Sequence, residues 1–146
     1  MLSKKTKYAI KALLALAEHG SETPLRIVDL AEQERIPKKF LEGILLALRN
    51  HGLLHSRKGQ QGGYLLARDP ATIMLGQVVR LFDGPLAPVP CASVTAYLPC
   101  DDCEDEATCG VRLAMREVRD ATARILDQTS LAALQRKVRR AADHRR

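Results

Sequence analysis

Apolar residues recur at steps of three and four in three stretches of the first fifty residues, which predicts three short helices packed on one another. Ser3 fits an N-cap for the first helix, and Gly20 fits its end. Thr23 and Pro24 form a cap and first-turn pair for the second helix, and Pro37 stands beside the start of the third. The inward-facing positions are Ala9, Leu13, Leu16 and Ala17, then Ile27, Leu30 and Ala31, then Phe40 or Leu41 with Ile44, Leu45 and Leu48.

A different pattern follows the third helix, which we expect to stop at residues 50–52. Residues 53–57 and 64–67 have the composition of two strands, and the glycine-rich residues 58–63 between them are typical of a hairpin tip. These glycines permit positive φ in the turn, and they also allow the backbone to approach a phosphate closely. Two helices joined by a tight turn and followed by a hairpin predict a winged helix, which is a mainly α fold with a small β-hairpin wing.

Beyond residue 110 the apolar residues again follow steps of four and three. The spacing is that of a coiled-coil seam about two heptads long, although a helix packed on its own domain would show the same short pattern. The seam consists of Val111, Met115, Val118, Thr122 and Ile125. The last residues, 129–146, form a basic tail that we expect to be frayed and solvated.

Charge is distributed unevenly along the 146 residues, whose formal net charge is +6. Residues 1–68 hold 12 Lys and Arg against 6 Asp and Glu, whereas residues 69–135 hold 5 against 10. Residues 136–146 are basic again, with 6 Lys and Arg against 1 Asp. The basic first half suits a polyanion partner, and the acidic middle does not.

All four cysteines fall in that acidic middle, in a loop directly before the last apolar pattern. Their spacing is C-x8-C-x2-C-x5-C, formed by Cys91, Cys100, Cys103 and Cys109. Four thiols in one loop can fill the coordination sphere of a metal ion or an iron–sulfur cluster. Residues 100–106 carry five carboxylates, which raise the pKa values of nearby thiols unless a cation offsets their charge. A metal or a cluster is such an offset.

Three other uses of the cysteines compete with a cluster. The chain begins without the apolar core of an export signal and has no apolar run that could cross a membrane, so we expect a cytoplasmic protein with reduced thiols rather than disulfides. A structural zinc site is the stronger competitor, although only Cys100 and Cys103 have the spacing of a zinc knuckle. A thiol–disulfide enzyme is disfavoured, because no cation flanks Cys100-x-x-Cys103, and we expect no enzyme.

Several segments together resemble the IscR/NsrR/RirA/CymR family of bacterial regulators, over nearly the whole chain apart from the last dozen residues. The resemblance runs through the wing and the cysteine loop, and the pattern G-x-x-G-G-Y in the wing is its most specific part. The matching segments are Tyr8-Ala9-Ile10, Ile36-Pro37-Lys38-Lys39-Phe40-Leu41-Glu42, Arg57-Lys58-Gly59-Gln60-Gln61-Gly62-Gly63-Tyr64, Leu75-Gly76-Gln77-Val78-Val79 and Asp83-Gly84-Pro85.

The resemblance implies a homodimeric winged-helix regulator, expected to be a repressor, that senses redox, iron or nitric oxide through an iron–sulfur cluster. Cys91, Cys103 and Cys109 fit the family's three cysteines. Where one branch has a histidine ligand this chain has Arg112, and where another has a carboxylate it has Lys7. Cys100 is therefore the expected fourth ligand. A 2Fe–2S or a 4Fe–4S cluster accepts four thiolates, and zinc or a cluster-free repressor is the alternative.

On the DNA side, the resemblance places the start of the third helix and the wing against a double-stranded operator. The expected DNA-binding residues are Lys38, Lys39, Glu42, Arg57, Lys58, Gly62 and Gly63. The expected organisation is a winged helix-turn-helix domain over 1–84, a cluster loop over 85–109, a dimerisation helix over 110–128 and the basic tail over 129–146.

Overall fold

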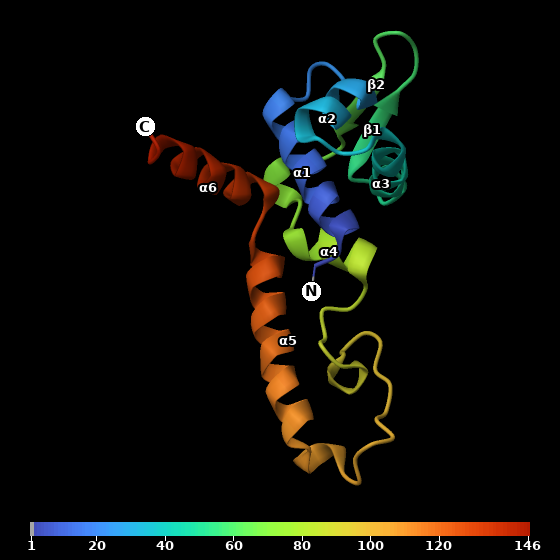
Figure 1. The fold of residues 1–146 in the computed structure, drawn as a ribbon, viewed down its shortest axis with the longest axis vertical. Helices are drawn as coiled ribbons and strands as arrows, with labels where there is room; N and C mark the ends of the chain where they lie inside the picture. Colours follow the sequence, from blue (N-terminus) through green and yellow to red (C-terminus); the bar gives the residue numbers. More distant parts are fainter. Residues whose placement is uncertain (1) are drawn as a thin grey trace.

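Helices make up most of the structure, a computed structural model that describes residues 2–146. A winged-helix body lies at one end, and a long helix with an irregular loop beside it extends from that body (Figure 1). The elements are α1 Lys4–His19, α2 Ile27–Glu34, α3 Lys38–Asn50, β1 Leu54–Arg57, β2 Gly63–Leu66, α4 Leu75–Asp83, α5 Gly110–Gln128 and α6 Leu131–Asp143, with short 3-10 helices at Pro70–Thr72, Pro90–Ala92 and Glu106–Thr108.

Both ends of α1 follow the sequence prediction. The Ser3 hydroxyl accepts a hydrogen bond from the Thr6 amide at 3.1 Å, as an N-cap does. Gly20 ends the helix with a φ of 94°, a conformation that costs glycine little. The predicted cap and terminator are therefore confirmed.

The predicted start of the second helix is wrong. We expected Thr23 and Pro24 to begin it, but α2 begins at Ile27. Leu25 is instead extended, because its amide and carbonyl pair with those of Tyr64 at 3.0 and 2.9 Å. A contact with the wing, about forty residues away along the chain, thus decides where the helix can begin.

The turn between α2 and α3 positions the third helix. Arg35 adopts the left-handed conformation, with a φ of 54°, and Ile36 is buried directly after it. The Ile36 amide donates to the Ala31 carbonyl at 3.0 Å, which closes the end of α2. Pro37 is then the residue before α3, as expected.

The wing is a two-stranded antiparallel hairpin in which Leu54 pairs with Leu66 and Arg57 with Gly63. With the helices before it, the hairpin completes a winged helix, so the predicted fold class is confirmed. The hydrophobic core lies between α1, α3, the hairpin and α4. Its fully buried side chains include Leu13, Leu41, Ile44, Leu45, Leu48 and Val78.

The expected frayed tail is also wrong, because residues 131–143 form helix α6. Ser130 caps this helix, and Leu131 is completely buried in the winged-helix core. Farther along, Arg139 pairs with Glu18 of α1 at 2.9 Å. The second half of α6 is exposed and runs away from the body (Figure 1).

Helix α5 differs from the others, since none of its residues is buried. Its end is tied to the winged helix by two backbone hydrogen bonds, from Leu75 to Thr129 at 2.9 Å and from Leu131 to Ile73 at 2.8 Å. Among the described residues, no helix is both long enough and apolar enough to span a membrane.

Candidate DNA interface and cysteine site

The start of α3 presents the three charged side chains that the sequence singled out. Lys38, Lys39 and Glu42 are all exposed. The Phe40 ring beside them packs edge-on against Tyr8, with ring centroids 5.6 Å apart. The start of α3 is therefore held against α1 while its charges face solvent, as a helix that reads DNA requires.

The wing carries Arg57 and Lys58 at the end of β1, and both are exposed. Gly62 and Gly63 both lie so close to other backbone atoms that a side chain would not fit. A Cβ on Gly62 would lie 2.3 Å from the Arg57 carbonyl oxygen, and one on Gly63 would lie 2.3 Å from that of Leu25. Gly63 also has a φ of 153°. Close backbone packing thus accounts for both residues before any contact with a phosphate is considered.

Sequence reasoning missed two further arginines beside the wing. Arg26 and Arg49 line a groove of about 410 Å³ together with Arg57 and Lys58. Arg49 also donates to the Ser56 hydroxyl at 3.3 Å. Helical spacing could have found it, because Arg49 lies seven residues after Glu42 and so on the same face of α3.

The four cysteines line a single cavity of about 640 Å³ between the loop and the start of α5. Cys91 is buried in the 3-10 helix Pro90–Ala92, and the other three are half-buried. Within residues 2–146, no three Cys, His, Asp or Glu side chains gather closely enough to hold one metal ion. The four thiols share the lining of this cavity with Asp101, Asp102 and Arg112.

One of the four thiols, that of Cys103, is held in its protonated form by its surroundings. Desolvation raises the pKa of Cys103 to about 11, and the neighbouring Cys100 adds to the effect. Of the carboxylates expected to cause such a shift, only Glu106 contributes to it. Hydrogen bonds from the Tyr97 hydroxyl and the Cys100 amide lower the pKa of Glu106 itself.

Two arginines of α5 contact the cysteine loop. Arg112 Nε donates to the Cys91 carbonyl at 3.0 Å, and Arg119 Nη1 donates to the carbonyl of the next residue, Ala92. The two arginines lie seven residues apart, hence on one face of the helix. This face of α5 holds the loop.

The residues of the predicted seam divide between two faces of α5. Val111, Val118 and Ile125 are 65%, 45% and 61% exposed, whereas Met115 and Thr122 are half-buried. By helical spacing, Ala114 and Ala121 lie between the three exposed residues and complete a heptad pattern. We call Val111, Ala114, Val118, Ala121 and Ile125 the apolar stripe.

An ion pair joins α5 to the winged helix. Arg80 of α4 and Asp127 form two parallel hydrogen bonds, one of them Nη2 to Oδ2 at 2.9 Å. These bonds lower the pKa of Asp127. A Cβ on Gly76 would lie 1.9 Å from Asp127 Oδ1, so the close approach of the carboxylate requires glycine there.

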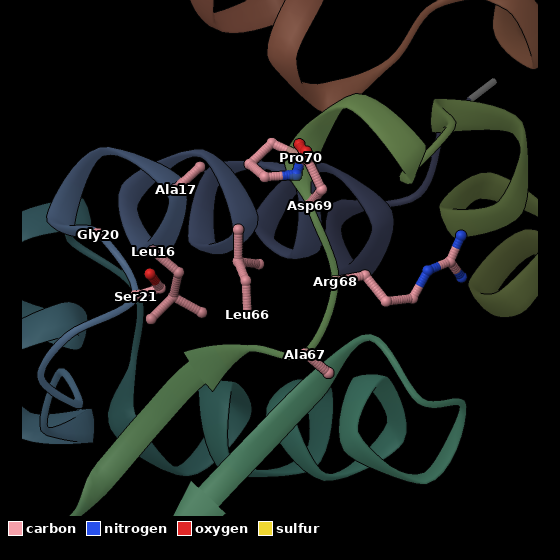
Figure 2. Close-up of a pocket in the computed structure, with 9 residues that line it drawn as sticks. All are labelled: Leu16, Ala17, Gly20, Ser21, Leu66, Ala67, Arg68, Asp69 and Pro70. Atoms are coloured by element: carbon pink, nitrogen blue, oxygen red, sulfur yellow. The ribbon is translucent and has the colours of Figure 1, made fainter.

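Another cavity, of about 540 Å³, lies between the end of α1 and residues 66–70 (Figure 2). Leu16 and Leu66 point into it, whereas the Arg68 side chain points away and donates to the Thr72 carbonyl at 2.7 Å. Asp69 is occupied in capping the next 3-10 helix. Arg68 and Asp69 at its edge are thus already paired within the chain.

A winged helix with a basic reading surface defines a DNA-binding protein, and comparison with known proteins gives the same class. Residues 2–137 match the family model Rrf2, described as an iron-dependent transcriptional regulator. The chain belongs to the Rrf2 family. Its relatives named IscR and CymR confirm the predicted family, and they are transcriptional regulators rather than enzymes.

Three relatives show the extent of the similarity. A Rhodobacter capsulatus protein, named as an rrf2-like HTH-type transcriptional regulator, is 47% identical over 121 residues, 81% of each chain. The structure of CymR, the global cysteine regulator of B. subtilis, has a TM-score of 0.78 and 30% identity, covering 94% of this chain and 97% of that one. T. potens IscR has a TM-score of 0.76 and 28% identity, covering 97% and 90%.

Proposed function

We propose that this protein is a cytoplasmic, dimeric, DNA-binding repressor whose affinity for its operator is set by an iron–sulfur cluster. The cluster would be held by Cys91, Cys100, Cys103 and Cys109. One observation carries the proposal, namely that all four thiols line the same cavity at the start of α5. The family description, which names iron, supports the choice of cofactor.

Cys100 is the fourth ligand in this proposal because of its place in the cavity. Arg112 lines the cavity as well, but it is a cation, and Lys7 is an exposed residue of α1. Neither can donate an electron pair to iron while protonated. When bound, the cluster supplies chemistry that responds to oxidants, nitric oxide and iron supply.

Dimerisation would use the apolar stripe of α5. A helix with uncovered apolar residues at heptad spacing gains stability by packing on a second helix. The match to CymR and IscR over more than nine-tenths of the chain supports this arrangement. Two α3 helices would then lie in successive major grooves, roughly 34 Å apart.

Lys38 and Lys39 would contact phosphates or guanine edges, and Glu42 would accept from cytosine amino groups. Arg57 and Lys58 would bring the wing to the DNA backbone or the minor groove. The loop would influence these contacts through α5, since Arg119 joins the loop to α5 and Asp127 joins α5 to Arg80 of α4.

The proposal is tested by titrating a duplex selected from a random pool, with protein purified without oxygen and with the same protein after iron chelation. We expect the two forms to differ in affinity for DNA. The binding of both should weaken steeply with salt, because bound lysines and arginines release counterions.

Lys39→Ala should reduce the salt slope by about 2 per dimer, whereas Glu42→Ala should change sequence preference. Arg116→Ala, on the exposed side of α5, is the control. Salt-independent binding, or no binding to any duplex in either form, would contradict the proposal.

A further inference from the structure

Arg112 has no role in the proposal so far, yet it lies at the cysteine cavity. Among the described residues that line the cavity, it is the only one with a positive charge, beside Asp101, Asp102 and the four thiols. Its side chain is 19% exposed. A partly buried cation next to several groups that become anionic has a large electrostatic effect, because water screens it poorly.

The guanidinium contacts two parts of the loop. Arg112 Nε donates to the Cys91 carbonyl at 3.0 Å, and Nη1 lies 3.5 Å from the Glu106 carbonyl. Arg112 Nε also lies 3.8 Å from the carboxylate oxygen Oε2 of Glu106, whose side chain is 24% exposed. The arginine therefore connects the beginning of the loop with its end.

Glu106 extends this connection to a second cysteine. Its Oε1 accepts the Cys100 amide at 3.1 Å, and its Oε2 accepts the Tyr97 hydroxyl at 2.5 Å. Through this carboxylate, Arg112 fixes the backbone of Cys100 as well as that of Cys91. Hydrogen bonds to charged groups contribute more than neutral ones, so the pair restrains the loop effectively.

We propose that Arg112 is a positioning residue of the cysteine site, which holds Cys91 directly and Cys100 through Glu106 so that both thiols face one cavity. Its charge also offsets the negative charge that four thiolates and a reduced cofactor bring. The first part concerns the protein alone, and the second rests on the proposed iron–sulfur function. A cation in the lining of the cavity would favour the more negative, reduced state of a redox group bound there.

In a simpler role, Arg112 would only donate a hydrogen bond to a backbone carbonyl of the loop. Arg119 provides the matched control, because it donates to the carbonyl of Ala92 from the same face of α5 but does not line the cavity. If only carbonyl contacts matter, Arg112→Gln and Arg119→Gln should behave alike. If Arg112 acts as proposed, they should differ.

The first readout uses metal-free protein and follows hydrogen exchange of the Cys100 amide by NMR. Arg112→Gln and Glu106→Ala should speed this exchange about tenfold or more, whereas Arg119→Gln should leave it within about twofold. The circular dichroism spectrum of each variant controls for folding. Equal exchange in wild type and Arg112→Gln would overturn the positioning role.

The second readout is the midpoint reduction potential of the loaded protein, measured by visible spectroscopy during a reductive titration. Arg112→Gln should move the midpoint to a more negative potential, and Arg112→Lys and Arg119→Gln should stay near wild type. An unchanged potential in Arg112→Gln would overturn the electrostatic part. If wild type takes up no iron and sulfide at all, the proposed function fails, while the exchange measurement still decides the positioning role.

Discussion

The winged-helix part, residues 2–84, and the part formed by the cysteine loop and α5, residues 85–128, bury their apolar side chains very differently. The first supplies nearly all of the core, including Leu13, Ile44 and Leu45 at 0% exposure. In the second, only Cys91, Ala92 and Ser93 are buried. The winged helix therefore holds most of the buried apolar contacts of the molecule, whereas the apolar stripe of the second part is largely exposed.

We expect this difference in packing to correspond to different functions of the two parts. A tightly packed body presents the reading surface rigidly, as direct contact with bases requires. A thinly packed loop and helix can change with what they bind, because few contacts must be broken. The response of the protein to a signal should therefore begin in residues 85–128.

The largest effects should come from the cysteines. Cys91→Ala, Cys103→Ala and Cys109→Ala should each prevent stable retention of the proposed cluster, since each removes a proposed ligand and the chain has no fifth cysteine. Cys100→Ala should lose or markedly destabilise it, although Asp101, Asp102 or Asp105 can substitute in part. Visible spectra and iron content measure this. A wild-type spectrum and lifetime in Cys100→Ala would show that the fourth ligand lies elsewhere.

The same substitution placed in each part tests the contrast in packing directly. Leu45→Ala should lower the free energy of unfolding by about 2–5 kcal/mol, because it leaves a cavity in the core. Leu113→Ala, at an α5 position that is 48% exposed and off the apolar stripe, should change it by less than about 0.5 kcal/mol. Urea denaturation of both variants measures the difference, and equal losses would mean that α5 is packed as firmly as the core.

A charge in the apolar stripe should separate the protomers. Val118→Asp removes apolar burial worth about 1.5 kcal/mol in each of two symmetry-related copies, so the dimer dissociation constant should rise roughly a hundredfold. Leu113→Asp on the neighbouring face is the control and should leave it near wild type. Sedimentation equilibrium gives both constants. A larger effect in the Leu113 variant would place the interface on a different face of α5.

The smallest effect concerns the ion pair that joins the two parts. The pKa of Asp127 is lowered in the folded protein, so its stabilisation is complete above the unfolded pKa of about 4 and is lost as pH falls through the folded value. The side chains are 38% and 43% exposed, which limits the contribution to about 1 kcal/mol. Asp127→Asn should therefore be slightly less stable than wild type at pH 7 and equal to it in strong acid. A difference that grows on acidification would contradict this.

The sequence predicted the elements that depend on local pattern. The periodic helices, Ser3 as a cap, Gly20 as an end and the glycine-rich wing all follow from residues close together in the chain. Errors arose where distant segments meet. Backbone pairing with Tyr64 keeps Leu25 extended, so α2 begins later than expected. Leu131 is buried in the winged-helix core, and the residues expected to be a frayed tail form α6.

The same limit applies to the site. The spacing of the four cysteines predicts that they share one loop. Only the fold shows that they line a single cavity. The roles of Glu106 and Arg112 depend on hydrogen bonds to Cys100 and Cys91, which no sequence pattern encodes. Likewise, the hydrogen bond from Arg119 to the Ala92 carbonyl shows which side of α5 faces the loop, and no sequence pattern encodes this bond.

The most direct test of the central claim is the metal and sulfide content of protein purified without oxygen. The protein should be brown and contain iron and acid-labile sulfide in about equal amounts, since both common cluster types hold equal numbers of the two. Stoichiometric zinc without sulfide, both as purified and after attempted reconstitution with iron and sulfide, would contradict it. Residues 85–109 would then form a zinc-stabilised loop of a repressor that does not sense through a cluster.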